Sequence, residues 1–171
     1  MKLIVPFILA LTLFESTAEG KVVLNEILAH SHDEAPDWIE LYNDGPASVA
    51  LEGWTLSDDK DNLGKYTIPT GVVIDPGGYL VLDQHETFGA PADDSSSSAN
   101  QPFALSENGE TLYLTSPSET IEQKIGPTPT GVPMGRYTDS SGGMQFVAMA
   151  EPTPGEANSA PRVGPIVITE I

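Results

Sequence analysis

Short runs rich in Val, Ile, Leu, Tyr and Thr, separated by Gly, Pro, Asn and Asp, constrain the fold of this chain more than any other feature. Runs of this length and content are typical of β-strands, and the residues between them are those that turns require. No convincing helical periodicity occurs after residue 20. The predicted strands are residues 21–29, 37–43, 49–57, 65–69, 71–75, 78–83, 103–106, 110–116, 119–125, 135–139 and 145–150. This is about the number that an all-β sandwich requires.

Two connections have recognisable turn chemistry. Residues 75–78, "DPGG", place a proline before glycines that accept positive φ, and Asn108-Gly109 in "ENGE" separates two strand-like runs. Both are predicted β-turns. The segment from Phe88 to Pro102 lacks the apolar content of a strand and is predicted to be a long, mobile loop. A solvated, flexible or glycosylated spacer is the preferred interpretation of that loop, with a functional loop as the alternative.

The first twenty residues have the parts of a secretory signal peptide. Lys2 is the basic end, residues 3–14 are the apolar run, and Ser16 and Ala18 are the small residues of a cleavage site. The run is too short to span a bilayer and no stop-transfer pattern follows, which disfavours a membrane anchor. We expect residues 1–20 to be removed. The mature chain is then secreted, acts outside the cell or at its surface, and does not insert in the membrane.

The charge balance excludes some partners. Seven Lys and Arg stand against 25 Asp and Glu, for a net charge of -18, which disfavours binding to nucleic acid or an anionic membrane. No basic patch is visible, because Lys60 and Lys65 lie among aspartates while Arg136 and Arg162 stand alone. The absence of cysteine excludes disulfides, thiolate metal sites and a cysteine nucleophile. Such acidity is typical of highly soluble or extracellular proteins, and it also allows clustered carboxylates to bind divalent cations.

The chain has room for one domain with a proper core. Residues 164–171, "GPIVITEI", echo residues 20–27, "GKVVLNEI", with Val, Glu and Ile in the same register at positions 167, 170 and 171. The predicted organisation is a domain over residues 21–159, a Pro/Gly/Ser-rich linker over 160–165, and the start of a second copy over 166–171. On this interpretation the chain is the N-terminal piece of a longer protein with further domains, and chance similarity is the alternative.

The stretch "DWIELYND", residues 37–44, contains a tryptophan flanked by acids. Alternation places Ile39 and Leu41 on the core face of a strand and Glu40 on the other face, beside two aromatic residues. We therefore expect Glu40 to be a solvated carboxylate in a cross-strand pair. Glu26 and Glu40 on neighbouring strands have the residue types of a glycosidase pair, but that chemistry needs a cleft and two divergent pKa values.

An ordered set of motifs resembles the lamin tail domain family. The motifs are "VVLNEI", "DWIELYND", "LEGWTLSDD", "KYTIPTGVVIDPGGYLVL", "FALSENGETLYLTS", "GRYTDSSGG" and "EPTPGEAN". Together they cover roughly residues 21–159, and the chain looks like a secreted prokaryotic member. The resemblance implies an immunoglobulin-like β-sandwich, with Trp54 as the buried tryptophan of the family and "PTPGEAN" as the closing turn after the final strand.

The resemblance also bears on function. Nuclear lamin tails follow a coiled-coil rod, but this chain has a signal peptide, no heptads and strong acidity, so filament and chromatin roles do not transfer. Secreted relatives imply a non-enzymatic binding, adhesion or spacer module that recognises a protein or glycan through loops or an exposed strand edge. The alternative is the accessory domain of a larger extracellular hydrolase, nuclease-like or phosphatase-like, with catalytic residues beyond residue 171. The chain lacks Gly-x-Ser-x-Gly and a phosphate-binding glycine loop, so we expect neither an enzyme nor a nucleotide cofactor.

Two acidic loops are candidate metal sites. "SDDKDNLGK" places four oxygen donors together, which makes it a candidate calcium site, although Leu63 stands where an EF-hand-like loop has a third ligand. A charged hairpin loop that solubilises a sheet edge is the preferred interpretation. "HSHDEAPD" offers imidazoles and carboxylates for Zn, Ni or Cu, with a polar loop as the preferred interpretation. The calcium ligands would be Asp58, Asp59, Asp61 and Asn62; the residues of the second loop are His30, His32, Asp33, Glu34 and Asp37.

Overall fold

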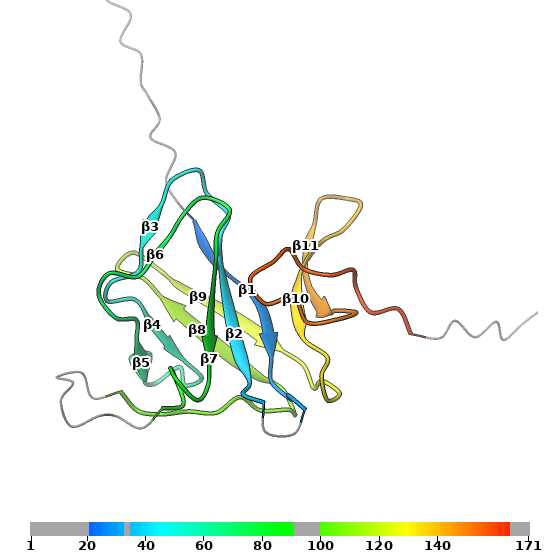
Figure 1. Ribbon diagram of the computed structural model, residues 1–171, viewed down its shortest axis with the longest axis horizontal. Helices are drawn as coiled ribbons and strands as arrows, with labels where there is room; N and C mark the ends of the chain where they lie inside the picture. Colours follow the sequence, from blue (N-terminus) through cyan, green and yellow to red (C-terminus); the bar gives the residue numbers. More distant parts are fainter. Residues whose placement is uncertain (1–20, 33–34, 91–99, 165–171) are drawn as a thin grey trace, which may run out of the picture.

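The computed structural model describes residues 21–32, 35–90 and 100–164, and every regular element within them is a β-strand (Figure 1). The strands are β1 (Val22–Leu28), β2 (Trp38–Asn43), β3 (Val49–Ala50), β4 (Thr55–Ser57), β5 (Tyr66–Thr67), β6 (Val73–Ile74), β7 (Tyr79–Asp83), β8 (Glu110–Thr115), β9 (Thr120–Ile125), β10 (Met134–Thr138) and β11 (Met144–Ala148). The predicted signal peptide, residues 91–99 of the predicted loop and the predicted second copy lie outside the described residues.

Two antiparallel sheets form the sandwich. One has the order β11-β10-β1-β2-β7 and the other the order β5-β4-β8-β9, while β3 and β6 make a separate two-stranded ribbon. The sheets bury an apolar layer between them, to which Ile27, Ile39, Leu56 and Leu112 each contribute a fully buried side chain. The predicted all-β, immunoglobulin-like β-sandwich is confirmed, including the core positions of Ile39 and Leu41.

The strand prediction differs from the structure in two places. The run over residues 49–57 contains two strands, because a turn at Gly53, which has a φ of 76°, separates β3 from β4. The run over residues 103–106 is not a strand: Phe103 and Leu105 are buried without sheet pairing, and Phe103 stacks on Phe88 with ring centroids 4.9 Å apart. Its apolar alternation therefore reflects burial and not strand pairing.

Both predicted turns are present. Gly78 N–H donates to the Asp75 carbonyl at 2.8 Å, and Gly77 has a φ of 72°. Gly109 N–H donates to the Ser106 carbonyl at 3.0 Å, with a φ of 90° at Gly109. A Cβ at position 109 would lie 2.8 Å from the Ile125 carbonyl oxygen, so this turn requires glycine for its conformation and for its space.

The more buried of the two tryptophans is Trp38 and not Trp54. Trp54 is only partly buried, packing against the edge of the core, whereas Trp38 in β2 is 8% exposed. The assignment of Trp54 as the buried tryptophan is therefore wrong. Trp38 lies on the outer face of its sheet, and its burial shows that another part of the chain covers that face.

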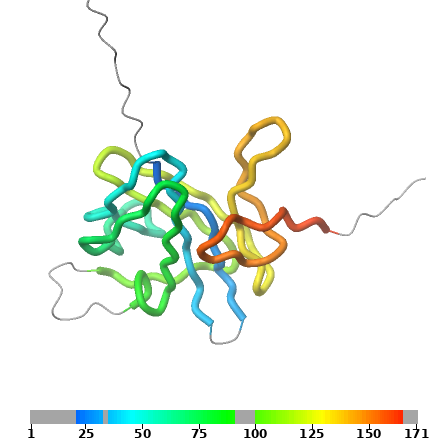
Figure 2. Tube along the Cα trace, turned by 45° about the horizontal axis from the view of Figure 1, so that its top comes forward, coloured from blue at the N-terminus to red at the C-terminus, as the bar shows by residue number. Residues whose placement is uncertain are grey.

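The segment of residues 149–162, here called the C-terminal strap, covers part of this outer face, at Glu26 and Glu40. Figure 2 shows it, orange to red, folding back beside β1 and the β10–β11 hairpin. Ala150 N–H donates to the Ala160 carbonyl and Arg162 N–H to the Ala148 carbonyl, at 2.9 and 2.8 Å. The backbone pairing thus continues through Arg162, into the stretch predicted as a linker. The described part of the chain contains no helix that is long and apolar enough to span a membrane.

Candidate functional site

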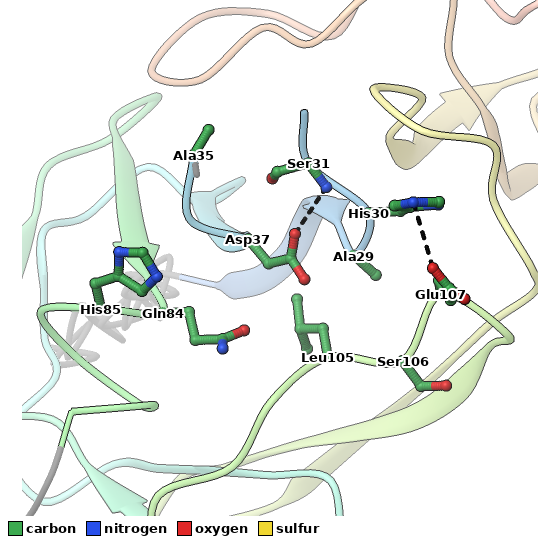
Figure 3. A pocket seen from close by; sticks show the side chains of 10 residues that line it. All are labelled: Ala29, His30, Ser31, Ala35, Asp37, Gln84, His85, Leu105, Ser106 and Glu107. Carbon is green, nitrogen blue, oxygen red and sulfur yellow. Dashed lines mark hydrogen bonds and ion pairs between the residues drawn. The ribbon is translucent and has the colours of Figure 1, made fainter. Parts of the chain in front are cut away.

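A hollow lies at one end of the sandwich, where three loops meet; it is called the loop-end pocket (Figure 3). Its volume is about 540 Å³. The loop after β1, the loop after β7 and the segment before β8 supply its walls. The lining residues are Ala29, His30, Ser31, Ala35, Asp37, Gln84, His85, Leu105, Ser106 and Glu107.

The right-hand wall of this pocket in Figure 3 is built around His30. Its Nε2 lies 3.3 Å from the Glu107 carboxylate and 3.0 Å from the Thr130 hydroxyl, and its Nδ1 lies 3.4 Å from the Thr128 carbonyl. These contacts fix the imidazole between two loops. Glu107 remains half-exposed, so its carboxylate faces both His30 and solvent.

The opposite wall presents hydrogen-bond acceptors. Asp37 Oδ1 accepts the Ser31 N–H at 2.9 Å, which closes the loop after β1. The Oε1 of Gln84 is buried and has no partner within the described residues. His85 is exposed at the rim. The carboxylates of Asp37 and Glu107 thus face the pocket from two sides, and a ligand that brings hydrogen-bond donors suits them.

The histidine-rich loop is spread over separate contacts. His30 faces Glu107, whereas His32 packs on Gly131, where a Cβ would lie 2.3 Å from the His32 Nε2. Asp33 and Glu34 lie outside the described residues. Among the residues that the structure describes, no group of three or more His, Cys, Asp or Glu side chains is placed to hold a metal.

The four predicted calcium ligands take part in the internal bonding of their own loop. Asp58 Oδ1 pairs with Lys65 Nζ at 2.6 Å, Asp59 Oδ1 accepts the Asp61 N–H, and Asp61 pairs with Lys60. The side chain of Asn62 donates to Gln101. A calcium ion would compete with two lysines for these oxygens, and the calcium site stays a prediction. A melting temperature that rises with calcium and falls again with chelator is its test.

Glu26 and Glu40 form a second polar site, on the outer face of the β1–β2 pair. They are direct cross-strand partners, and both side chains are fully buried. A β-bulge at Asn25 shifts the register of β1 between Leu24 and Glu26, so that Leu24 and Ile27 both reach the core while Asn25 joins the glutamates. The expectation that Glu40 is solvated is therefore wrong.

The C-terminal strap supplies most of the hydrogen bonds to this pair. Thr153 donates its backbone N–H and its hydroxyl to Glu26 Oε2, at 3.0 and 2.9 Å. Gly155 N–H donates to Glu40 Oε2, and Asn25 Nδ2 donates to Glu40 Oε1. Asn158 ties the strap to β1 and β10 through Asn25 and the Arg136 carbonyl. The strap covers the pair, which leaves no cleft for a glycosidic substrate.

Three buried carboxyl groups have raised pKa values. Burial raises the pKa of Glu26 to about 7, against the lowering effect of the two Thr153 hydrogen bonds, and the charge of Glu40 adds to the rise. Burial also raises the pKa of Glu40, against the hydrogen bonds from Gly155 and Asn25. Burial raises the pKa of Glu110 to about 7, against the hydrogen bond from Ser106. Glu26 and Glu40 are fully buried and Glu110 is partly buried, and none of the three lines the loop-end pocket.

Sequence reasoning found only part of either site. His30 and Asp37 were identified as polar loop residues, but Gln84, His85 and Glu107 come from distant segments that no local motif connects to them. Glu26 and Glu40 were paired correctly across strands, while their cover was missed. The signal for that cover was the "PTPGEAN" motif, whose Thr153 and Gly155 are the donors.

Comparison with known proteins identifies one relationship. A family model described as Lamin Tail Domain matches residues 15–128, about two thirds of the chain. No curated protein and no solved structure matches the chain. The match ends before β10, so the β10–β11 hairpin and the C-terminal strap lie outside the matched range.

Proposed function

The chain belongs to the lamin tail domain family, a non-catalytic domain type, and from this membership we propose that it is a secreted binding module that recognises a protein or a glycan at or outside the cell surface. The proposal assigns recognition to side chains on a rigid scaffold and no chemistry to this domain.

The loop-end pocket is the observation that carries the proposal. Loops at the end of a sandwich are free to vary while the sheets hold them in place, and this end is hollowed and polar. Asp37 and Glu107 offer acceptor oxygens, and His85 stands at the rim. Sugar hydroxyls, or the N–H groups of a protein segment, bring the complementary donors.

The sequence supports a location outside the cell. Residues 1–20 have the pattern of a secretory signal peptide, and the net charge of -18 suits a soluble exported chain that avoids anionic surfaces. This location makes cell-surface proteins and glycans the relevant ligands, and the remaining domains of a longer parent protein would be neighbours of the module.

A second recognition surface is favoured by the open edge of β9. β9 is the last strand of its sheet, and beside it lies a groove of about 430 Å³ lined by residues of β1, β9, β10 and β11. Met144, which is 51% exposed, and Ile121 give the groove an apolar character. An extended protein segment that pairs with β9 would place its side chains in this groove.

Binding assays with paired variants test the proposal. The purified, labelled chain is applied to an array of glycans and to cells of its source, with and without protease treatment of those cells. We expect the chain to bind one of these ligands. The double variant His85→Ala, Glu107→Ala should weaken this binding at least tenfold, whereas Glu86→Ala, an exposed change next to the pocket, should leave it unchanged. Loss of binding with Met144→Ser alone would assign recognition to the β9 groove. Absence of binding to every glycan and cell preparation would contradict the proposal.

A further inference from the structure

The hydrogen bonds around Glu26 and Glu40 distinguish the four carboxyl oxygens. Both oxygens of Glu40 accept a bond, one from Asn25 Nδ2 and one from Gly155 N–H. Oε2 of Glu26 accepts two bonds, both from Thr153. Oε1 of Glu26 is buried and has no hydrogen-bond partner among the described residues.

This asymmetry identifies the oxygen that carries a proton. A proton on either oxygen of Glu40 would point at an N–H donor, so Glu40 is suited to the ionised form. A buried, ionised oxygen without a donor is unfavourable, and protonation of Glu26 at Oε1 removes that charge. Protonation there leaves both Thr153 bonds to Oε2 in place.

The charged and titratable groups around the pair do not neutralise it. Tyr79 in β7 faces Glu40, whose charge contributes to the raised pKa of that tyrosine, and Tyr42 stacks on Tyr79 with ring centroids 4.8 Å apart. Arg136 in β10 directs its guanidinium to Asp44, at 3.4 Å. The carboxylates of the strap, Glu151 and Glu156, are exposed. Neither Glu26 nor Glu40 has an ion-pair partner in the described part of the chain.

We propose that the C-terminal strap is a proton-dependent latch, which closes over the Glu26–Glu40 pair while Glu26 carries a proton at Oε1 and loosens when that proton is lost. Two like charges on facing strands then repel each other beneath the strap, and water entering to solvate them competes with Thr153 and Gly155. The strap also covers the end of the β11 edge, where Arg162 N–H donates to the Ala148 carbonyl. Loosening therefore exposes the Ala148 carbonyl at this end of β11 for pairing with another strand.

Amide hydrogen exchange on the intact secreted chain tests the latch. Protection factors of the Thr153 and Gly155 amides, corrected for intrinsic rates, are compared at pH 5 and pH 8. The proton that Glu26 retains is bound more tightly in the closed state, so we expect protection to fall by about a hundredfold over this range. The Gly143 amide, which donates to the exposed Asp139 carboxylate, is the internal control, because hydrogen bonds from Ser141 and Gly143 lower the pKa of Asp139 and its protection should hold.

Two isosteric variants separate the roles of the glutamates. Glu26→Gln keeps an acceptor for Thr153 and replaces the proton-bearing oxygen by an amide nitrogen, so strap protection should become independent of pH and stay high at pH 8. Glu40→Gln turns an NH₂ group toward an existing donor, so protection should be low at both pH values. An unchanged pH response in Glu26→Gln, or equal protection at pH 5 and pH 8 in the unaltered chain, would overturn the proposal.

Discussion

At the scale of the residue, Glu40 shows what a local sequence pattern can and cannot predict about the environment of a side chain. Alternation placed Ile39 and Leu41 correctly, because the side chains of a strand point to opposite faces whatever lies above them. It could not predict what covers the outer face, since Gly155, the donor to Glu40, is 115 positions away in the sequence. The same limit applies to Trp54, whose partial exposure depends on distant packing. Local pattern thus predicts direction, and tertiary packing decides burial.

Gly109 provides a test at this scale. Replacement by alanine forces a Cβ to within 2.8 Å of the Ile125 carbonyl oxygen at a φ of 90°, so Gly109→Ala should lower the free energy of unfolding by about 1–3 kcal/mol. Chemical denaturation measures the change. Gly126→Ala is the matched control, because a Cβ there meets nothing within 4 Å. Equal effects of the two variants would contradict this account of the turn.

Strands and connections show what the sequence pattern does and does not encode. Most predicted runs became strands within one or two residues at each end, because Gly, Pro and Asx residues mark the turns clearly. The strand prediction for residues 103–106 was wrong because apolar residues alternate in an extended connection with one buried side just as they do in a strand. Phe103 in this segment stacks on Phe88, so a connection between strands contributes a side chain to the hydrophobic core.

This aromatic pair makes a prediction at the scale of the element. Phe88 is 1% exposed, so Phe88→Ala should create a cavity and destabilise the fold by about 3–5 kcal/mol. Thermal or urea unfolding measures the loss. Phe146→Ala in β11, where the ring is only partly buried, should have a clearly smaller effect. A small effect at Phe88 would show that the connection is peripheral to the core.

The C-terminal strap is the element whose position was least predictable from the local sequence. Thr153→Val keeps the backbone donor to Glu26 but removes the hydroxyl donor, so it should destabilise the fold by about 1 kcal/mol. Equilibrium denaturation at pH 7 measures the change. Thr130→Val is a suitable comparison, because its exposed hydroxyl bonds only to His30 at the loop-end pocket. A neutral Thr153→Val would indicate that the strap is held by its backbone bonds alone.

At the scale of the whole molecule, the net charge of the chain and its carboxyls with raised pKa values both lower the stability of the fold as the pH rises. The net charge of -18 makes the folded state increasingly self-repulsive as acids ionise. Burial raises the pKa values of Glu26, Glu40 and Glu110. A carboxyl with a raised folded-state pKa contributes stability that is fully present below its unfolded value and is lost as the pH rises through its folded value. This molecule is therefore expected to be most stable in mild acid.

The measurement that tests the central claim most directly is the free energy of unfolding of the intact chain between pH 5 and pH 8. The account predicts a fall across this range, with Glu26 alone contributing roughly 3 kcal/mol as its pKa of about 7 is passed, and Glu26→Gln should remove that contribution while the part due to Glu110 remains. A free energy that is flat or rises toward pH 8 would contradict a buried, proton-holding carboxyl pair beneath the strap.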